Sequence, residues 1–239
     1  MIKLENYEVM GWEHAIRGMR NPMNSWEKGD SDYHCPYTAG GGCGDCGQNM
    51  VIGPNDHSLM MRLRNAGTDH RKYMRMITVY VDITAPLYWW KEFDTYKVGS
   101  VANSCSTMHK IHEKEFTLED FSHEHLCMIT KDNLRRTIEI LNIYRGLFIN
   151  WDKKDDNTKN ALLTGISECG EFDKKDAWWQ MIQLLPSSYN QKRTVMLNYE
   201  VLANMYKSRK AHKLDEWREF CKWVEGLPYS EIIIGGKEE

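Results

Sequence analysis

The sequence predicts an α+β fold in which helices pack against a mixed sheet. One observation is the segment 73–83, where β-branched residues alternate with polar ones and would share one face of a strand: Ile77, Val79, Val81 and Ile83. A second is the stretch after Lys131, where apolar residues recur at helical spacing: Leu134, Ile138, Leu141 and Phe148. Segments of both kinds follow one another without regular βα alternation, and this mixed order favours α+β over α/β.

The other expected elements are bounded by capping residues, glycines and prolines. Further helices are expected at 57–66, 87–97, 173–185, 198–206 and 212–225. A short strand is expected at 193–197, and Asn198 directly after it is a good cap for the next helix. The stretch 21–54 contains few aliphatic residues and a triple glycine, which predicts a long loop.

Length and charge limit the classes of function. The 239 residues are expected to form a single domain over 1–239, with the Gly/Cys-rich loop at about 21–54 as an insertion. With 31 basic and 34 acidic residues the formal net charge is −3, so no broad nucleic-acid surface is expected. The sequence has neither an apolar run of about 20 residues nor the apolar core of a signal peptide. We therefore expect a cytoplasmic protein with no membrane partner.

A cluster of soft ligands within the predicted loop gives a metal hypothesis. Cys43 and Cys46 have the C-x₂-C spacing of zinc sites, and His34 and Cys35 precede them. A second C-x₂-C pair is missing, so two interpretations stay open: a structural zinc site, or an ordinary Gly-rich loop.

Two segments resemble the flavin-dependent thymidylate synthases. The segment 83–110 follows that family's order of a strand, an apolar-Pro-apolar turn and a helix, and Lys97 and Ser100 fit its R-H-R-x-x-S signature. The segment 185–217 matches more closely, from a Leu-Pro start to a helix opened by asparagine and ended by arginine. Its matching residues are Leu185, Pro186, Asn198, Asn204 and Arg209, with His212 close to the family's histidine. The resemblance covers roughly two thirds of the chain.

The resemblance implies a homotetramer that binds FAD and a uracil nucleotide such as dUMP. It also implies methylenetetrahydrofolate and NADPH as co-substrates, in a reaction that moves a one-carbon unit to the uracil ring with hydride from the reduced flavin. The flavin would carry the difficult chemistry, which agrees with the absence of an evident nucleophile–base pair and of any assigned catalytic side chain.

Each residue carried over from the resemblance has a second, purely structural interpretation. For the substrate, Arg209 would hold the pyrimidine edge, Lys97 a phosphate, and Ser100 a hydroxyl bond. For the cofactor, the expected contacts are Asn198, Asn204, Lys91 and His212. Asn198 is equally well explained as a helix cap, Ser100 as a turn residue, and Arg209 and Lys97 as solvated charges.

The departures from the family signature leave the function open. Thr95, Tyr96 and Thr107 stand where the signature has two arginines and a histidine, so positive charge is missing where phosphorylated ligands should bind. A lost charge-assisted bond costs about 1.5–3 kcal/mol. Three functions are compatible with this: a thymidylate synthase-like transferase, a non-catalytic nucleotide-binding relative, and a zinc-stabilised interaction protein built on Cys35, Cys43 and Cys46.

Overall fold

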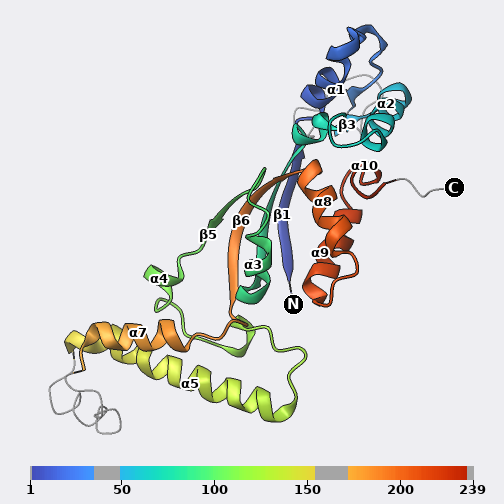
Figure 1. Cartoon of the computed structure of the whole chain (residues 1–239). Coiled ribbons are helices and arrows are strands. Elements are labelled where there is room, and N and C mark those ends of the chain that lie inside the picture. The colour runs from blue at the N-terminus through green and yellow to red at the C-terminus, as the bar shows by residue number, and fades with distance from the viewer. Residues whose placement is uncertain (1, 35–48, 154–171, 236–239) are drawn as a thin grey trace. The chain divides into compact units, whose positions relative to one another are not determined.

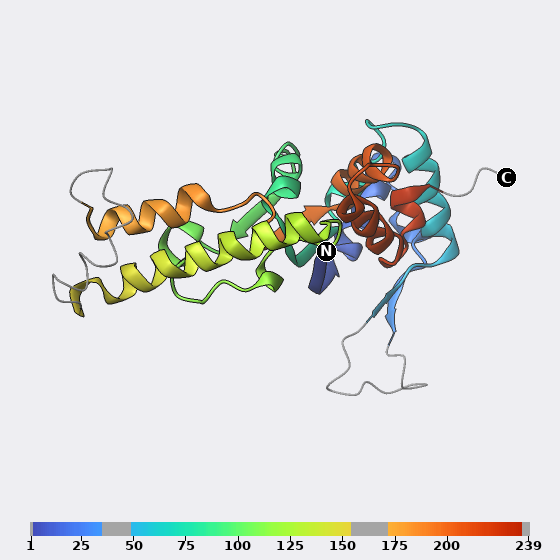
Figure 2. The same cartoon turned by 90° about the horizontal axis from the view of Figure 1, so that it is seen from below.

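The fold combines helices with a four-stranded sheet, as the sequence predicts. A computed structural model describes residues 2–34, 49–153 and 172–235 of the chain, and Figures 1 and 2 show it in two views. The sheet has the strand order β1-β4-β6-β5. Its strands are β1 (Lys3–Met10), β4 (Thr78–Pro86), β5 (Val101–Ser104) and β6 (Asn190–Asn198).

The described chain divides into two compact units. The first comprises 84–93 and 103–193, and the second comprises 2–83, 94–102 and the residues from 194 onward. The chain therefore passes from one unit to the other four times. The single domain over 1–239 stays a prediction.

β4 is the strand predicted most clearly from the sequence, although its limits differ. Val79, Val81 and Ile83 are almost completely buried, as the alternation predicts. The expected start at residue 73 is wrong, because Lys72–Arg75 form the 3₁₀ helix η3, in which the hydroxyl of Tyr73 donates to the carbonyl of Met60 at 2.8 Å. The strand continues to Pro86, and the helix after it, α3 (Leu87–Phe93), is shorter than expected.

In the second unit, helices surround an aromatic core. They are α1 (Trp12–Arg20), α2 (Pro54–Asn65), α8 (Tyr199–Arg209), α9 (Asp215–Glu225) and α10 (Glu231–Ile234), with 3₁₀ turns η1 (Asn21–Met23) and η2 (Trp26–Lys28). Trp12 meets Tyr199 edge to face at 5.3 Å, and the hydroxyl of Tyr199 donates to the carbonyl of Pro228 at 2.5 Å. α8 packs against both α9 and α10.

The described part of the predicted loop 21–54 is more ordered than expected. Besides η1 and η2 it contains an antiparallel hairpin of β2 (Asp32–His34) and β3 (Asn49–Val51), in which Tyr33 pairs with Met50. The hairpin and η2 frame the start of α2, where the carboxylate of Asp30 accepts bonds from the backbone nitrogens of Asn55 and Asp56 at 2.9 and 3.0 Å. Because this cap comes from a distant residue, α2 begins at Pro54, three residues earlier than expected.

One buried ion pair ties α1 to α2. Arg20 donates through Nε to the carboxylate of Asp56 at 2.7 Å, and the side chains are 5% and 0% exposed. Ser31 donates its hydroxyl to the same carboxylate at 2.6 Å. Burial alone raises the pKa of Asp56, but the hydrogen bonds from Ser31, the Asp30 backbone and Arg20 outweigh it and hold the pKa below its ordinary value.

The first unit is built on two long helices. α5 (Met128–Asn150) and α7 (Lys174–Leu184) lie side by side in both views (Figures 1 and 2). The predicted apolar face of α5 is buried against the preceding chain and α7: Leu134, Ile138 and Leu141 pack with Ile111, Phe116, Phe121 and Met181. The smaller elements of this unit are α4 (Thr107–Lys110), η4 (Leu118–Asp120) and η5 (Trp151–Lys153). No helix of the described residues has the length and apolar character needed to cross a membrane.

Candidate functional site

α8 in the second unit carries three of the predicted site residues. Its cap is Asn198, whose Oδ1 accepts from the backbone nitrogen of Val201 at 3.0 Å, so the capping interpretation is confirmed. Arg209 ends the helix. With a rise of 1.5 Å per residue, these two side chains lie about 16 Å apart, and the 100° turn per residue places both on one face. A ligand that touched both would have to extend along the helix.

Arg209 is held by two aromatic side chains. Its Nε donates to the hydroxyl of Tyr96 at 2.9 Å. The centre of its guanidinium lies 4.8 Å from the ring centroid of Trp217 and 5.6 Å from that of Tyr96, both within the range of cation–π contact. This fixes the plane of the guanidinium at the end of α8, where a fixed fork of donors can recognise carbonyl or phosphate oxygens.

The segment 94–102, a loop that runs into the first residues of β5, follows the same face of α8. Tyr96 reaches Arg209 at one end, and at the other the carbonyl of Gly99 accepts from Nδ2 of Asn198 at 3.3 Å. Gly99 has a φ of +78°, and a Cβ there would lie 2.9 Å from that Nδ2 and 3.0 Å from Cγ2 of Val201. Only glycine fits this close approach. Ser100 donates its hydroxyl to the carbonyl of Tyr96, so its single proton holds the turn.

The loop therefore uses the groups that were expected to meet a cofactor. Asn198 gives its oxygen to Val201 and its nitrogen to Gly99, and it is 8% exposed. His212, just beyond α8, accepts at Nδ1 from the backbone nitrogen of Leu214 at 3.2 Å. Both side chains work as internal braces in this arrangement.

A charged cluster lies at the start of α8. Glu200, 8% exposed, accepts from Arg75 and from Nε of Arg71 at 3.4 Å. The hydrogen bond with Glu200 raises the pKa of Arg75. Arg71 also donates to Oδ1 of Asn204 at 3.1 Å, so this predicted cofactor residue is exposed but already has one partner.

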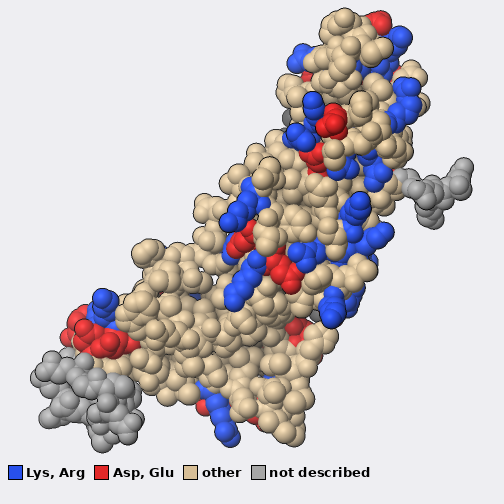
Figure 3. Space-filling model, in the orientation of Figure 1, with Lys and Arg blue, Asp and Glu red and all other residues tan. Residues whose placement is uncertain are grey.

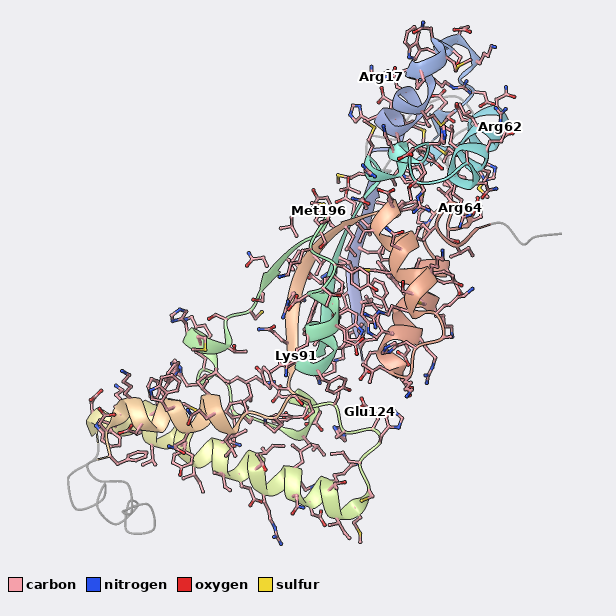
Figure 4. The ribbon with its side chains drawn as sticks, viewed as in Figure 1. Arg17, Arg62, Arg64, Lys91, Glu124 and Met196 are labelled. Atoms are coloured by element: carbon pink, nitrogen blue, oxygen red, sulfur yellow. The ribbon has the colours of Figure 1, made fainter. Side chains whose placement is uncertain are left out.

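The two predicted lysines are exposed. Lys97 is part of the loop 94–102, next to Tyr96. Lys91 lies on α3, in the first unit (Figure 4). The structure thus brings Lys97, Ser100, Asn198, Asn204, Arg209 and His212 into one unit.

The predicted metal ligands belong to the stretch 34–46 of the chain. Cys35, Cys43 and Cys46 lie outside the described residues, as does the side chain of His34. Within the described ranges, no group of three or more His, Cys, Asp and Glu side chains is placed to hold a metal ion.

Comparison with solved structures identifies the fold. Thymidylate synthase X from Helicobacter pylori, solved with FAD and dUMP, superposes with a TM-score of 0.55 at 16% sequence identity, over 97% of this chain and 94% of that one. A second structure of the H. pylori flavin-dependent enzyme, also with FAD and dUMP, gives the same score and identity over 95% of its length. The fold is that of a flavin-dependent thymidylate synthase.

Sequence comparison adds nothing to this likeness in fold. No protein-family model matches the chain, and no curated protein does. Two residues that hold Arg209 are not predicted from the sequence as site residues. Tyr96 was counted as a lost histidine, yet it is a partner of Arg209. Trp217 lies on α9 and is completely buried, and no motif of the sequence indicates its contact with Arg209.

Proposed function

We propose that this protein binds a uracil nucleotide, with Arg209 as the group that recognises the ring. The observation that carries the proposal is the guanidinium of Arg209, fixed between Tyr96 and Trp217 at the end of α8. A planar, oriented fork of donors suits a carbonyl-rich pyrimidine edge. Support also comes from the fold, because the H. pylori proteins that share it were solved with dUMP.

Lys97 would supply charge for the phosphate. It is exposed and lies in the same loop as Tyr96, so a nucleotide whose ring meets Arg209 has a cation one residue away from the tyrosine. Ser100 would act as an acceptor, because its proton already bonds the carbonyl of Tyr96. These roles remain proposals for each residue.

Three of the four residues expected to hold FAD already bond within the protein. Asn198 accepts from the backbone of Val201 and donates to Gly99. Nδ1 of His212 accepts from the backbone of Leu214, and the oxygen of Asn204 accepts from Arg71. Nucleotide binding at Arg209 requires none of these groups.

The complete transferase reaction is a second candidate function. It is favoured by the extent of the fold likeness, since the superposition covers 97% of this chain and 94% of a structure that holds both FAD and dUMP. Under this proposal the protein would use FAD, NADPH and methylenetetrahydrofolate. An absorption spectrum of the purified protein after FAD is added and the excess removed decides the point, because a colourless protein excludes it.

A homotetramer is part of the same proposal. It is supported by isoleucines exposed along α5: Ile129 at 71%, Ile140 at 42% and Ile143 at 55%. Light scattering of the 28.1 kDa chain tests it, and a monomer at micromolar concentration would contradict it.

The decisive experiment is calorimetric titration of dUMP into four proteins: wild type, Arg209→Ala, Arg209→Lys and the control Arg136→Ala. Arg136 is an exposed arginine of α5 in the first unit. We expect Arg209→Ala to weaken binding by about 10- to 150-fold, the worth of one charge-assisted contact. Arg209→Lys should recover only part of this, because an ammonium lacks the paired donors. Equal affinities in wild type and Arg209→Ala would refute the proposal.

A further inference from the structure

A cavity lies in the second unit, bounded by α1, α2 and η3. Its volume is about 850 Å³, within the range of about 300–1,000 Å³ that small-molecule pockets occupy. Apolar side chains form part of its wall: Met19, Leu59, Leu63 and Tyr73. Met19 and Tyr73 are buried, so this apolar surface is fixed.

Cations from separate elements surround the cavity. Lys28 ends η2, Arg62 belongs to α2, and Lys72 begins η3; His70 precedes that turn. Asp69 is the one carboxylate among the described residues that line it. Figure 3 shows blue Lys and Arg side chains over the part of the molecule that carries α1 and α2, and Figure 4 labels Arg62 there.

Three of these cations have no partner among the residues that the structure describes. Arg20, which also lines the cavity, bonds Asp56 and the carbonyls of Ser25 and Lys28. By contrast, the side chains of Lys28, Arg62 and Lys72 form no hydrogen bond or ion pair with any residue that the structure describes. Three long cationic side chains that line one cavity without a partner among the described residues indicate a ligand with several negative charges.

The cavity is separate from the site at Arg209. Arg71, directly before η3, and Arg75, at its end, bond Glu200 at the start of α8. Lys72, between them in sequence, lines the cavity instead. None of Tyr96, Arg209 and Trp217 is among the cavity's lining residues.

We infer that this cavity binds a nucleoside triphosphate. The separate cations match a triphosphate better than a ligand with a single carboxylate, which needs one or two. Asn55 and Ser58 of α2, with Asp69, offer donors and acceptors for sugar hydroxyls and a base edge. The apolar wall of Leu59, Leu63 and Tyr73 suits the flat face of a base.

The test is calorimetric titration of ATP, GTP, CTP and UTP, with inorganic tripolyphosphate as the probe for charge alone. All titrations use the Arg209→Ala background, so that binding at the α8 site does not contribute. We expect one nucleotide to bind with a stoichiometry of one per chain. The double variant Arg62→Glu/Lys72→Glu should weaken that binding by at least about 100-fold, the combined worth of two charged contacts.

A matched double charge reversal serves as control. Arg136→Glu/Lys222→Glu alters two exposed cations on α5 and α9 by the same total charge, and should change affinity by less than about 3-fold. A milder pair, Arg62→Gln/Lys72→Gln, should give an intermediate loss and guards against misfolding of the charge-reversed protein.

Three outcomes would overturn the inference: no nucleotide binds, tripolyphosphate binds as tightly as the best nucleotide, or both charge reversals weaken binding equally. Failure of dUMP binding in the wild type would refute only the proposed function, because the two sites share no residue.

Discussion

Buried side chains with several hydrogen-bond partners stabilise the second unit, and Asp56 is the clearest case. Its carboxylate is completely buried and receives bonds from Arg20, Ser31 and the backbone. Asp56→Asn would leave the buried guanidinium of Arg20 without a counter-charge. We expect the free energy of unfolding in urea to fall by about 3–5 kcal/mol.

The control for this variant is Asp132→Asn. Asp132 pairs with Arg135 on the exposed surface of α5, with side chains 52% and 54% exposed. Such pairs contribute about 0–1 kcal/mol. If both variants lost the same stability, the buried pair would have no special role.

The pH dependence of stability follows from the same carboxylate. Because the pKa of Asp56 is lower in the folded than in the unfolded protein, its contribution is present above the unfolded pKa of about 3.9 and is lost as the pH falls through the folded pKa. In acid titrations followed by circular dichroism, wild type should lose more stability below pH 4 than Asp56→Asn does. Parallel curves would contradict this assignment.

At the scale of an element, α8 depends on its cap. Asn198→Ala removes the oxygen that accepts from Val201 and should cost about 1–2 kcal/mol in urea unfolding. Asn198→Asp keeps a good capping oxygen and should cost much less, while losing the donor to Gly99. If the Asp variant were as unstable as the Ala variant, the bond to Gly99 would matter more than the cap.

The loop 94–102 depends on its glycine. Gly99→Ala places a Cβ against Asn198 and Val201 at a φ that side chains rarely adopt, so we expect a loss of at least about 1 kcal/mol and weaker dUMP binding through Tyr96. Gly146→Ala is the matched control, because a Cβ there meets nothing within 4 Å inside α5. That change should stabilise by about 0.5–1 kcal/mol. The prediction fails if both changes stabilise the protein.

Elements with strong periodicity could be predicted from the sequence, and elements defined by distant partners could not. α5 follows directly from the spacing of Leu134, Ile138 and Leu141. The start of α2 depends on Asp30, which accepts from the backbone nitrogen of Asn55, 25 residues further along the chain. The same holds for the site: Arg209 was identified from its position, but its contact with Tyr96 joins residues that are 113 positions apart.

At the scale of the whole molecule, alkaline stability should reflect the one cysteine of the described chain that is buried. Cys221 is 3% exposed, and burial raises its pKa to about 11, whereas Cys105 and Cys127 are exposed. Since the folded pKa is higher than the unfolded value of about 8.5, folding stability should fall as pH rises from about 8.5 to about 11. The slope is at most about 1.4 kcal/mol per pH unit.

Cys221→Ala isolates this effect. The substitution lowers stability at every pH through lost packing, but it should flatten the slope between pH 9 and 11, which urea unfolding at several pH values measures. Cys127→Ala, at an exposed position, should leave the slope unchanged. An unchanged slope in Cys221→Ala would mean that other groups cause the alkaline loss.

The close approach of Gly99 to α8 also has an evolutionary consequence. A substitution at position 99 should be disfavoured on its own, because its side chain would collide with Asn198 and Val201. Lineages that lose this glycine should therefore carry smaller side chains at 198 and 201, so that the three positions vary together.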